Sequence, residues 1–296
     1  MSTAPSRPLA AVLRRLEWAA LAVVFRLFRL VPVDLASATM GWLWRRLAPL
    51  NSRHRRALRH LAAAMPELPE AERQRIIADM WTNLGRVTAE TFHIDRLLRD
   101  RSRYEIVVDE MTRDIIANRR ACLFVSLHTG NWELCVAPAV WEGMEITGVY
   151  QALKNEHSDA LLRGLRQDLY KGGLLSKGHQ AARRLISTLR QGGVVAIMGD
   201  LRERRGVHVP FFGRPATATP VPVALARSCD VPIVIGRTVR LDGVRFRVEG
   251  RAFLPQRTED RDADIQAGCE VIHAQFEAWI REYPAQWMWI HRKWDH

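Results

Sequence analysis

The residues best placed to do chemistry stand in the stretch SLHTGNWE, residues 126–133. His128 follows the apolar run ACLFV, which is typical of a buried strand, and Glu133 comes five residues after it, beyond Gly130. A carboxylate in the first turn of a helix can reach back to an imidazole at the end of the preceding strand. There it holds the tautomer of the ring while the other nitrogen takes a proton. The spacing therefore predicts a general base with its orienting acid.

The nature of the attacking group follows from what surrounds this pair. Ser126 lies two residues before His128 on the same side of the strand, but no G-x-S-x-G elbow surrounds it. We therefore expect proton abstraction from a substrate hydroxyl, to which such a base contributes about 10²–10⁴-fold. A second reading fits the spacing equally well: Glu133 complements a helix dipole and His128 is a hydrogen-bonded strand-end residue. The motif does not favour a metal site, because H-x4-E lacks the second histidine of H-E-x-x-H. We also expect no cofactor.

The elements that position these residues are indicated by alternating patterns. Short apolar runs read as strands, at Tyr104–Val108, Ala121–Leu127, Ile146–Gln151, Val194–Gly199 and Val231–Val239. Helical patterns follow at Asn131–Trp141, His157–Tyr170, Gln180–Gln191, Val221–Ser228 and Asp262–Glu282. This alternation predicts an α/β fold with a mixed, largely parallel sheet flanked by helices. Asp242-Gly243 predicts a hairpin that adds antiparallel strands at one edge.

A second polar residue, Asp200, ends the run VVAIMG much as His128 ends its own run. Sites in open α/β sheets gather outside the carboxyl ends of strands, so both residues are candidates for one site. The alternative for Asp200 is a cap of the loop that follows it.

Charge is the most informative feature of the composition. The 296 residues carry a formal net charge of +12, which favours anionic partners such as nucleic acid, acidic lipid or an acidic protein. A basic surface that serves only solubility is the alternative. The four cysteines show neither a close pair nor metal-ligand spacing, which favours a reducing compartment.

The N-terminal segment has the pattern of a membrane-surface helix. Its longest uncharged run, Trp18–Phe25, is shorter than the ~20 residues that span a bilayer. Arg15, Arg26 and Arg29 fall within about 60° of one another on a helix whose other side is apolar. We expect this helix to lie in the headgroup plane. A core-packed helix with an exposed arginine edge and a tilted span are the alternatives.

Further basic residues extend this segment. Trp42 and Trp44 stand beside arginines, and RHRRALRH follows from Arg53 to His60. We therefore divide the chain into a membrane-associated helical segment over residues 1–60 and a catalytic α/β domain over residues 61–296. A helical stretch opens this domain after Pro66 and Pro69 and runs to about residue 98.

The motif and the blocks around it resemble the late acyltransferases of lipid A biosynthesis, members of the wider glycerolipid acyltransferase superfamily. The resemblance covers most of the chain. The matching blocks are PELPEAERQRIIADMWTNLGR, the H-x4-E motif, VYQALKN followed by Arg166, GGVVAIMGD, VPFFGRPATAT and WIREYPAQWMWIHRKW. There are departures: Leu201 stands where the family often has glutamine, and Met65-Pro66 stands where the family has Phe-Pro.

The resemblance implies acyl transfer from an acyl carrier protein thioester to a hydroxyl of a lipid A precursor, with no acyl-enzyme. It implies His128 as the base, Glu133 as its orienter, and Arg166 as a residue that helps the thioester oxyanion or a phosphate. Arg166 as a solvated helix residue is the alternative. Asp200 matches a family aspartate. The implied location is the cytoplasmic face of the bacterial inner membrane, with an anionic glycolipid as acceptor.

Several residues in and after the H-x4-E motif are candidates for substrate contact. Asn131 lies within the motif. The next two blocks contain four arginines: Arg202, Arg204, Arg205 and Arg214. They can bind an anionic lipid or an acidic carrier protein. The alternative is that they are solvated loop charges. Phe211 and Phe212 line the acyl entrance or plug the core.

Other functions remain open on the residues alone. The acceptor could be another polar lipid or a glycolipid, and the donor coenzyme A. A non-catalytic basic membrane-binding protein is a further alternative. Nucleic acid is disfavoured, because no nucleic-acid-binding motif is present.

Overall fold

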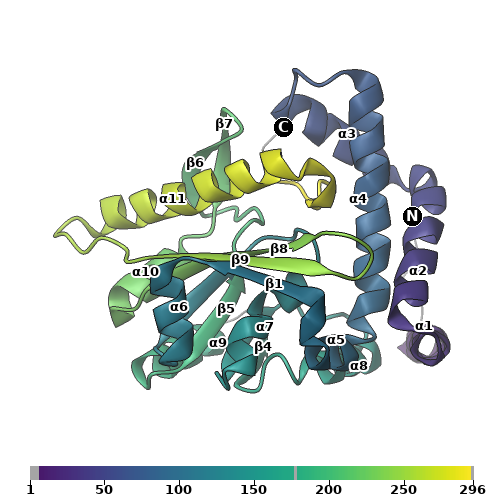
Figure 1. Cartoon of the computed structure of the whole chain (residues 1–296), viewed down its shortest axis with the longest axis horizontal. Helices are drawn as coiled ribbons and strands as arrows, with labels where there is room; N and C mark the ends of the chain where they lie inside the picture. The colour runs from purple at the N-terminus through teal and green to yellow at the C-terminus, as the bar shows by residue number, and fades with distance from the viewer. Residues whose placement is uncertain (1–6, 177–178, 295–296) are drawn as a thin grey trace.

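A seven-stranded sheet forms the centre of the computed structural model, which describes residues 7–176 and 179–294 (Figure 1). The strand order across the sheet is β1 (Tyr104–Val108), β9 (Phe246–Phe253), β8 (Ile233–Arg240), β2 (Cys122–Ser126), β5 (Val194–Met198), β3 (Ile146–Tyr150) and β4 (Gly173–Ser176). Neighbouring strands are parallel except β8 and β9, which are antiparallel across the expected Asp242-Gly243 turn. The predicted mixed, largely parallel sheet is thus confirmed.

Helices cover both faces of this sheet. In Figure 1, α11 (Arg261–Glu282) and the β6–β7 hairpin (Val207–Phe211 and Arg214–Ala218) lie above it. The helices below it are α5 (Ile94–Arg99), α6 (Glu110–Ala117), α7 (Ala137–Trp141) and α8 (Glu156–Arg166). Two further helices, α9 (His179–Arg190) and α10 (Val221–Cys229), contribute buried residues to the same core as α11.

The central strand β2 explains why its sequence reads as a continuous apolar run. Its alternate residues Leu123 and Val125 enter one core, whereas Cys122 and Phe124 enter the core on the other face. Side chains of a strand alternate between the two faces, so a strand covered on both sides is apolar throughout. This burial fixes the end of β2, and with it His128.

Four N-terminal helices pack along one end of the sheet: α1 (Arg7–Leu30), α2 (Val33–Leu47), α3 (Ser52–Ala64) and α4 (Glu70–Thr91). The short helix η1 (Ala48–Leu50) joins α2 to α3. Pro69 immediately precedes α4, and Glu70 and Glu72 complement the dipole of its first turn. Helix α2 runs antiparallel to α4, because Ser37 contacts Glu90 at one end and Arg45 pairs with Asp79 at the other.

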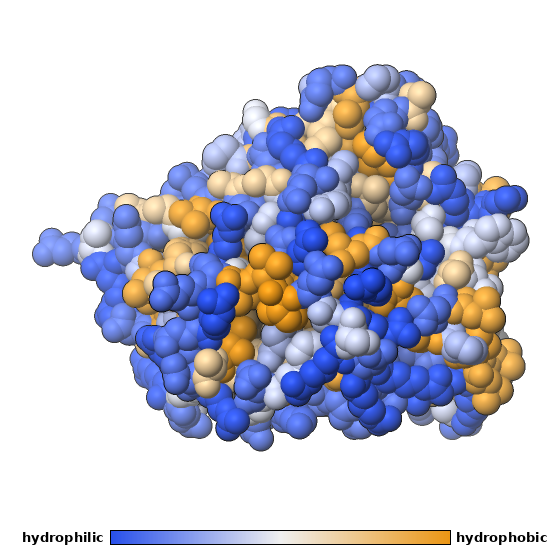
Figure 2. Space-filling view, viewed as in Figure 1, coloured by the Kyte–Doolittle hydropathy of each residue, from blue (hydrophilic) through white to orange (hydrophobic). Residues whose placement is uncertain are grey.

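Helix α1 differs in one respect from the expected arginine stripe. Arg15 and Arg26 are exposed, but Arg29 is half-buried, pairs with Asp95 and donates to the carbonyl of Phe92 at 3.0 Å. Apolar residues line the outward side of the helix instead, at Val12, Leu16, Val23, Leu27 and Leu30. Figure 2 shows apolar residues gathered at the right edge, over α1 and α2. Among the helices that the structure describes, none combines the length and apolarity needed to cross a bilayer.

Candidate active site

His128 lies directly beyond β2, with 13% of its side chain exposed. Its Nδ1 atom is 2.8 Å from Oδ1 of Asp200, and its backbone N–H donates to Oδ2 of Asp200 at 2.9 Å. The indole N–H of Trp287 donates to the same Oδ2 at 2.9 Å. Asp200 follows β5, which pairs in parallel with β2, so the two strands end side by side. Adjacent strands therefore bring this imidazole and this carboxylate together.

The acid beside His128 is thus Asp200, and the expected pairing with Glu133 is corrected. Glu133 accepts two hydrogen bonds from Arg166, one of them from Nε at 2.9 Å. The reason is local geometry: after Gly130 the chain enters a 3₁₀ helix, η3 (Trp132–Val136), which directs the buried Glu133 carboxylate toward α8. The carboxylate that holds the ring therefore follows the neighbouring strand β5 and does not come from the H-x4-E motif.

Electrostatics fixes the protonation of this pair. Burial alone would raise the pKa of Asp200, but the positive charge of His128 and the hydrogen bonds from His128 and Trp287 lower that pKa well below its usual range. An ionised carboxylate only accepts hydrogen bonds, so Nδ1 of His128 carries the hydrogen. Nε2 is then left as the proton acceptor. This arrangement can remove a proton from a hydroxyl group.

Two aromatic rings flank the imidazole. The ring of Trp132 lies 5.1 Å from that of His128, and the ring of His291 lies 5.4 Å away on the C-terminal segment. Burial, assisted by the charge of His128, lowers the pKa of His291 to about 4, so this second imidazole is neutral near pH 7. Sequence reasoning missed His291. Its signal was a histidine within the tryptophan-rich block QWMWIHRKW.

The turn after His128 depends on a glycine. Gly130 has φ +55°, and a Cβ atom there would lie 1.9 Å from the carbonyl oxygen of Thr238. The carbonyl of Gly130 accepts from the amide of Asn83 at 2.9 Å, and its N–H donates to Gln286 at 3.2 Å. Only glycine combines this conformation with such close approach of two backbone segments.

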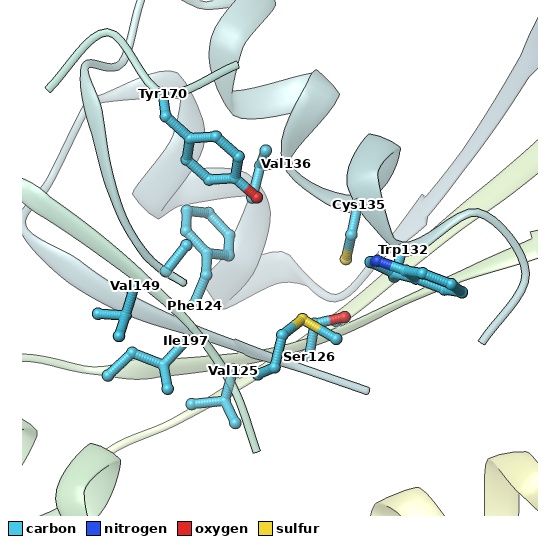
Figure 3. A pocket seen from close by; sticks show the side chains of 12 residues that line it. Phe124, Val125, Ser126, Trp132, Cys135, Val136, Val149, Tyr170 and Ile197 are labelled. Carbon is cyan, nitrogen blue, oxygen red and sulfur yellow. The ribbon is translucent and has the colours of Figure 1, made fainter. Parts of the chain in front are cut away.

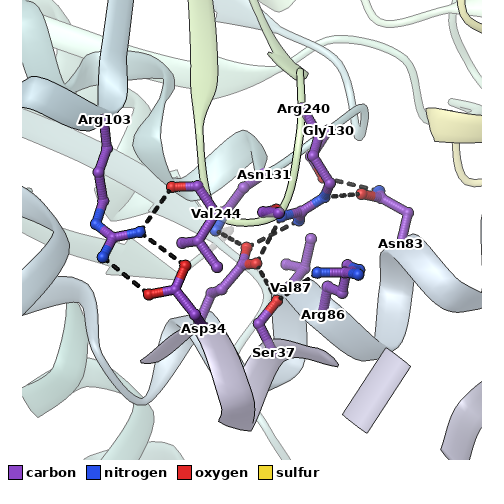
Figure 4. Close-up of polar contacts among 12 residues, drawn as sticks. Asp34, Ser37, Asn83, Arg86, Val87, Arg103, Gly130, Asn131, Arg240 and Val244 are labelled. Atoms are coloured by element: carbon purple, nitrogen blue, oxygen red, sulfur yellow. Dashed lines mark hydrogen bonds and ion pairs between the residues drawn. The ribbon is translucent and has the colours of Figure 1, made fainter. Parts of the chain in front are cut away.

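A buried polar network supports the same turn (Figure 4). The fully buried carboxylate of Glu90 on α4 accepts from Asn131 at 2.8 Å and from Ser37 at 2.6 Å. Arg240 donates to it through two nitrogens, at 2.6 and 2.8 Å, and also donates to Asn83 at 2.9 Å. Asn131, expected to contact substrate, is completely buried and serves this network.

Sequence reasoning missed the acidic centre of that network. Glu90 stands on the face of α4 that also buries Val87 and Thr91, and an acidic residue on a buried helical face signals a buried partner. The partner, Arg240, is 150 residues away in the chain, so no local pattern identifies it.

An apolar cavity adjoins the site (Figure 3). Trp132, the neighbour of His128, lies at one side of the cavity and Tyr170 at another. Its remaining lining includes Phe124, Val125, Val136, Val149 and Ile197. The cavity measures about 30 Å³, enough for roughly one or two water molecules. An alkyl chain enters this space only if lining side chains move.

The other candidate residues occupy different environments. Phe211 and Phe212 are buried among the tryptophans of the C-terminal segment, which fits a core plug rather than an acyl entrance. Arg214 lies over the ring of Trp294 at 5.6 Å. Arg204 and Arg205 are exposed in the loop after Asp200, and Arg202 there is half-buried.

Comparison with known proteins supports the resemblance over the full length. The family model described as bacterial lipid A biosynthesis acyltransferase matches residues 6–296. No curated protein matches the chain.

Proposed function

The chain belongs to the bacterial lipid A biosynthesis acyltransferase family, and from this premise we propose that it transfers a fatty acyl chain from an acyl carrier protein thioester to a hydroxyl of a lipid A precursor. Membership makes the protein an acyltransferase. The donor, the acceptor hydroxyl and the roles of the residues are the proposal. The observation that carries it is the His128 imidazole, held through Nδ1 by an ionised Asp200 beside an apolar cavity.

In the proposed reaction, Nε2 of His128 takes the proton of the acceptor hydroxyl while its oxygen attacks the thioester carbonyl carbon. The carbonyl oxygen becomes an oxyanion in the tetrahedral intermediate. Collapse of this intermediate reforms the carbonyl and breaks the carbon–sulfur bond. The leaving thiolate then receives the proton from the imidazolium, which Asp200 stabilises throughout.

Direct attack without an acyl-enzyme is supported by the nucleophiles near the site. Ser126 donates to the carbonyl oxygen of Leu127 at 3.5 Å rather than to an imidazole. Cys135 is buried, and its burial raises the pKa of the thiol to about 11, so it is not a thiolate near neutral pH.

We assign Arg166 and Glu133 to the wall of the site. Glu133 engages Nε and one terminal nitrogen of Arg166, whereas Nη1 makes no hydrogen bond to any described residue. A guanidinium fixed on one edge in this way can present its other edge to the oxyanion or to a phosphate. Both residues thus keep a role beside the base, with Glu133 acting on Arg166.

We also propose that α1 and α2 lie against an anionic membrane surface, which places the enzyme at the cytoplasmic face of the inner membrane. Besides the outward residues of α1, α2 exposes Leu35, Trp42, Leu43 and Leu47. The guanidinium of Arg46 lies 5.3 Å from the ring of Trp42. Exposed apolar residues with tryptophan and arginine suit the headgroup region of a bilayer.

One experiment tests both parts of the proposal. Purified His128→Ala is compared with wild type in transfer from the acyl carrier protein thioester and in retention on anionic vesicles. We expect transfer to fall by at least ~10²–10⁴-fold while retention is unchanged, because the base follows β2 and is not one of the exposed residues of α1. His208→Ala, an exposed position on β6, is the matched control. Wild-type turnover in His128→Ala would refute the mechanism, and no retention of either protein would refute the membrane contact.

The same assay separates the alternative substrates. Coenzyme A thioesters replace the carrier-protein donor, and other polar lipids or glycolipids replace the lipid A precursor. Faster transfer with either replacement would reassign the donor or the acceptor without changing the role of His128.

A further inference from the structure

Helix α3 carries a positive charge that the rest of the chain does not balance. Residues 35–65 contain no aspartate or glutamate, yet Arg53, Arg55, Arg56 and Arg59 all lie on α3. At about 100° per residue, Arg55, Arg56 and Arg59 fall within about 100° of one another and Arg53 falls about 60° beyond Arg56, whereas Ala57, Leu61 and Ala64 are buried. Arg53, Arg55 and Arg59 are exposed and form no ion pair with a carboxylate of residues 7–176 or 179–294.

Several arginines elsewhere in the molecule are neutralised by carboxylates. Arg103, Arg227 and Arg240 each form an ion pair with an aspartate or glutamate. Unpaired guanidinium groups concentrated on one helical face produce a strongly positive local potential, which attracts anionic partners.

The arginine face of α3 borders the catalytic histidine. Arg56 donates to the carbonyl of Ile290 at 3.4 Å, and Nδ1 of His60 is 2.9 Å from the carbonyl oxygen of Trp289. The next residue along this segment is His291, whose ring lies 5.4 Å from that of His128. Arg53 and Arg56 also contribute, after burial and the charge of His128, to the lowered pKa of His291. A partner on this face would therefore lie next to the C-terminal segment that carries His291, the neighbour of His128.

We propose that the arginine face of α3 is the docking surface for the acidic acyl carrier protein. The inference rests on the proposed function, because it locates the donor of that reaction. Carrier proteins of this class present acidic surfaces, and complementary charge guides association and fixes orientation. Docking on α3 brings the thioester arm to His128 from the side of His291.

The composition of the exposed face favours a protein partner over the bilayer. Helices α1 and α2 expose large apolar side chains, such as Leu27, Trp42 and Leu43. Within the described part of the chain, α3 exposes no large apolar side chain. Stable binding in the headgroup region depends on buried apolar area as well as charge, so α3 is the weaker membrane-binding element and the stronger electrostatic docking element.

The test reverses two of the exposed charges. Arg53→Glu combined with Arg59→Glu is compared with a matched reversal on α9, Arg183→Glu combined with Arg190→Glu, which also changes two exposed arginines. Steady-state kinetics are measured with the acyl carrier protein thioester and with acyl-pantetheine, which lacks the protein. Retention on anionic vesicles is measured in parallel. Arg53→Gln combined with Arg59→Gln provides a milder variant in case reversal impairs folding.

We expect the α3 reversal to raise KM for the carrier protein at least about tenfold at low salt, with kcat and the turnover of acyl-pantetheine unchanged. The effect should shrink as salt is added, because screening shortens the reach of charge to about 8–10 Å near physiological ionic strength. The milder variant should change KM in the same direction. The α9 reversal should leave KM within about twofold of wild type, as expected for exposed charges remote from an interface.

Other results would overturn the inference. An unchanged KM for the carrier protein in both α3 variants would remove the docking surface while leaving the proposed function intact. Loss of vesicle retention with an unchanged KM would assign the face to the membrane instead. A wild-type enzyme that uses acyl-pantetheine but never the carrier-protein thioester would refute the donor of the proposed function, and this surface with it.

Discussion

At the level of single residues, the main feature of the site is that His128 contacts Asp200 and not Glu133. Oδ1 of Asp200 accepts the hydrogen bond from Nδ1 of His128. Oδ2 of Asp200 accepts hydrogen bonds from the indole of Trp287 and from the backbone N–H of His128. Glu133 lies closer in sequence but holds Arg166. The geometry thus assigns one carboxylate to the imidazole of His128 and the other to the guanidinium of Arg166.

The first prediction concerns Asp200→Asn. An asparagine retains the size of the side chain but removes the charge that fixes the tautomer of His128 and stabilises its imidazolium. We expect kcat to fall by ~10²–10⁴-fold, with a smaller change in KM. Steady-state kinetics with the carrier-protein thioester measures this effect.

Glu133→Gln is the matched control for Asp200→Asn. It removes the charge that pairs with Arg166 but leaves the contact between His128 and Asp200 in place. Its kcat should therefore exceed that of Asp200→Asn. The opposite order of the two rates would return the orienting role to Glu133.

Several secondary-structure elements together position the turn after His128. Helix α4 supplies Asn83 and Glu90, strand β8 supplies Arg240, and helix α2 supplies Ser37. Asn83 and Glu90 contact the turn at Gly130 and Asn131, and Arg240 and Ser37 hold Glu90, so three elements together immobilise the turn. The turn itself needs only a glycine that tolerates the left-handed conformation.

The second prediction compares two glycine-to-alanine changes. In Gly130→Ala the new Cβ meets the carbonyl of Thr238 in a left-handed conformation, so we expect a loss of several kcal/mol in unfolding free energy together with loss of transfer. In Gly164→Ala, within α8, no atom lies within 4 Å of the new Cβ. This change should stabilise the protein by about 0.5–1 kcal/mol and preserve transfer.

Denaturant unfolding and the transfer assay check both variants. A stable, active Gly130→Ala enzyme would show that the turn relaxes without the close contact to β8. Destabilisation by Gly164→Ala would contradict the open space along α8.

The molecule as a whole carries a formal net charge of +12 and also buries several titratable groups in its core. The core between the sheet and α11 contains His273, whose Nδ1 bonds the carbonyl of Cys269 at 2.9 Å and whose Nε2 lies 2.8 Å from the buried Nζ of Lys293. Burial, followed by the charge of Lys293, lowers the pKa of His273 to about 3. Burial likewise lowers the pKa of His291 to about 4.

The third prediction follows from these lowered values. An unfolded histidine has a pKa near 6.5, so each group contributes stability that is present above pH 6.5 and lost as pH falls toward the folded value. Between pH 7 and pH 5 each contributes a loss of about 2 kcal/mol in unfolding free energy. Asp200 does not contribute in this window, because its folded pKa lies below the usual range of an aspartate and both states are ionised at pH 5.

Denaturant unfolding at the two pH values measures the loss. His273→Gln should reduce the difference by about 2 kcal/mol, since glutamine can still accept from Lys293 but does not titrate. An equal loss in wild type and variant would show that His273 does not resist protonation in the folded protein.

Local sequence determined the features that depend on burial and backbone conformation within a few residues. The run ACLFV predicted a buried strand because both of its faces are covered. Asp242-Gly243 predicted the β8–β9 hairpin because these residues tolerate a tight turn. The position of His128 at a strand end followed directly, as did the family resemblance.

Some elements were missed because their signals are atypical. The β6–β7 hairpin turns at Phe212 and Gly213, which both have positive φ. Such a turn favours asparagine and glycine, so a phenylalanine at the first position conceals it. The same phenylalanine was a candidate for either the acyl entrance or a core plug, and packing buries it in the core.

Only the tertiary structure decided which groups meet. Asp200 reaches His128 because β5 inserts between β2 and β3, an order set by the packing of the complete sheet. Glu90 and Arg240 pair across 150 residues for the same reason. The spacing of apolar residues indicates which side of each segment is buried. The pairing of distant segments depends on how all of the buried faces fit together.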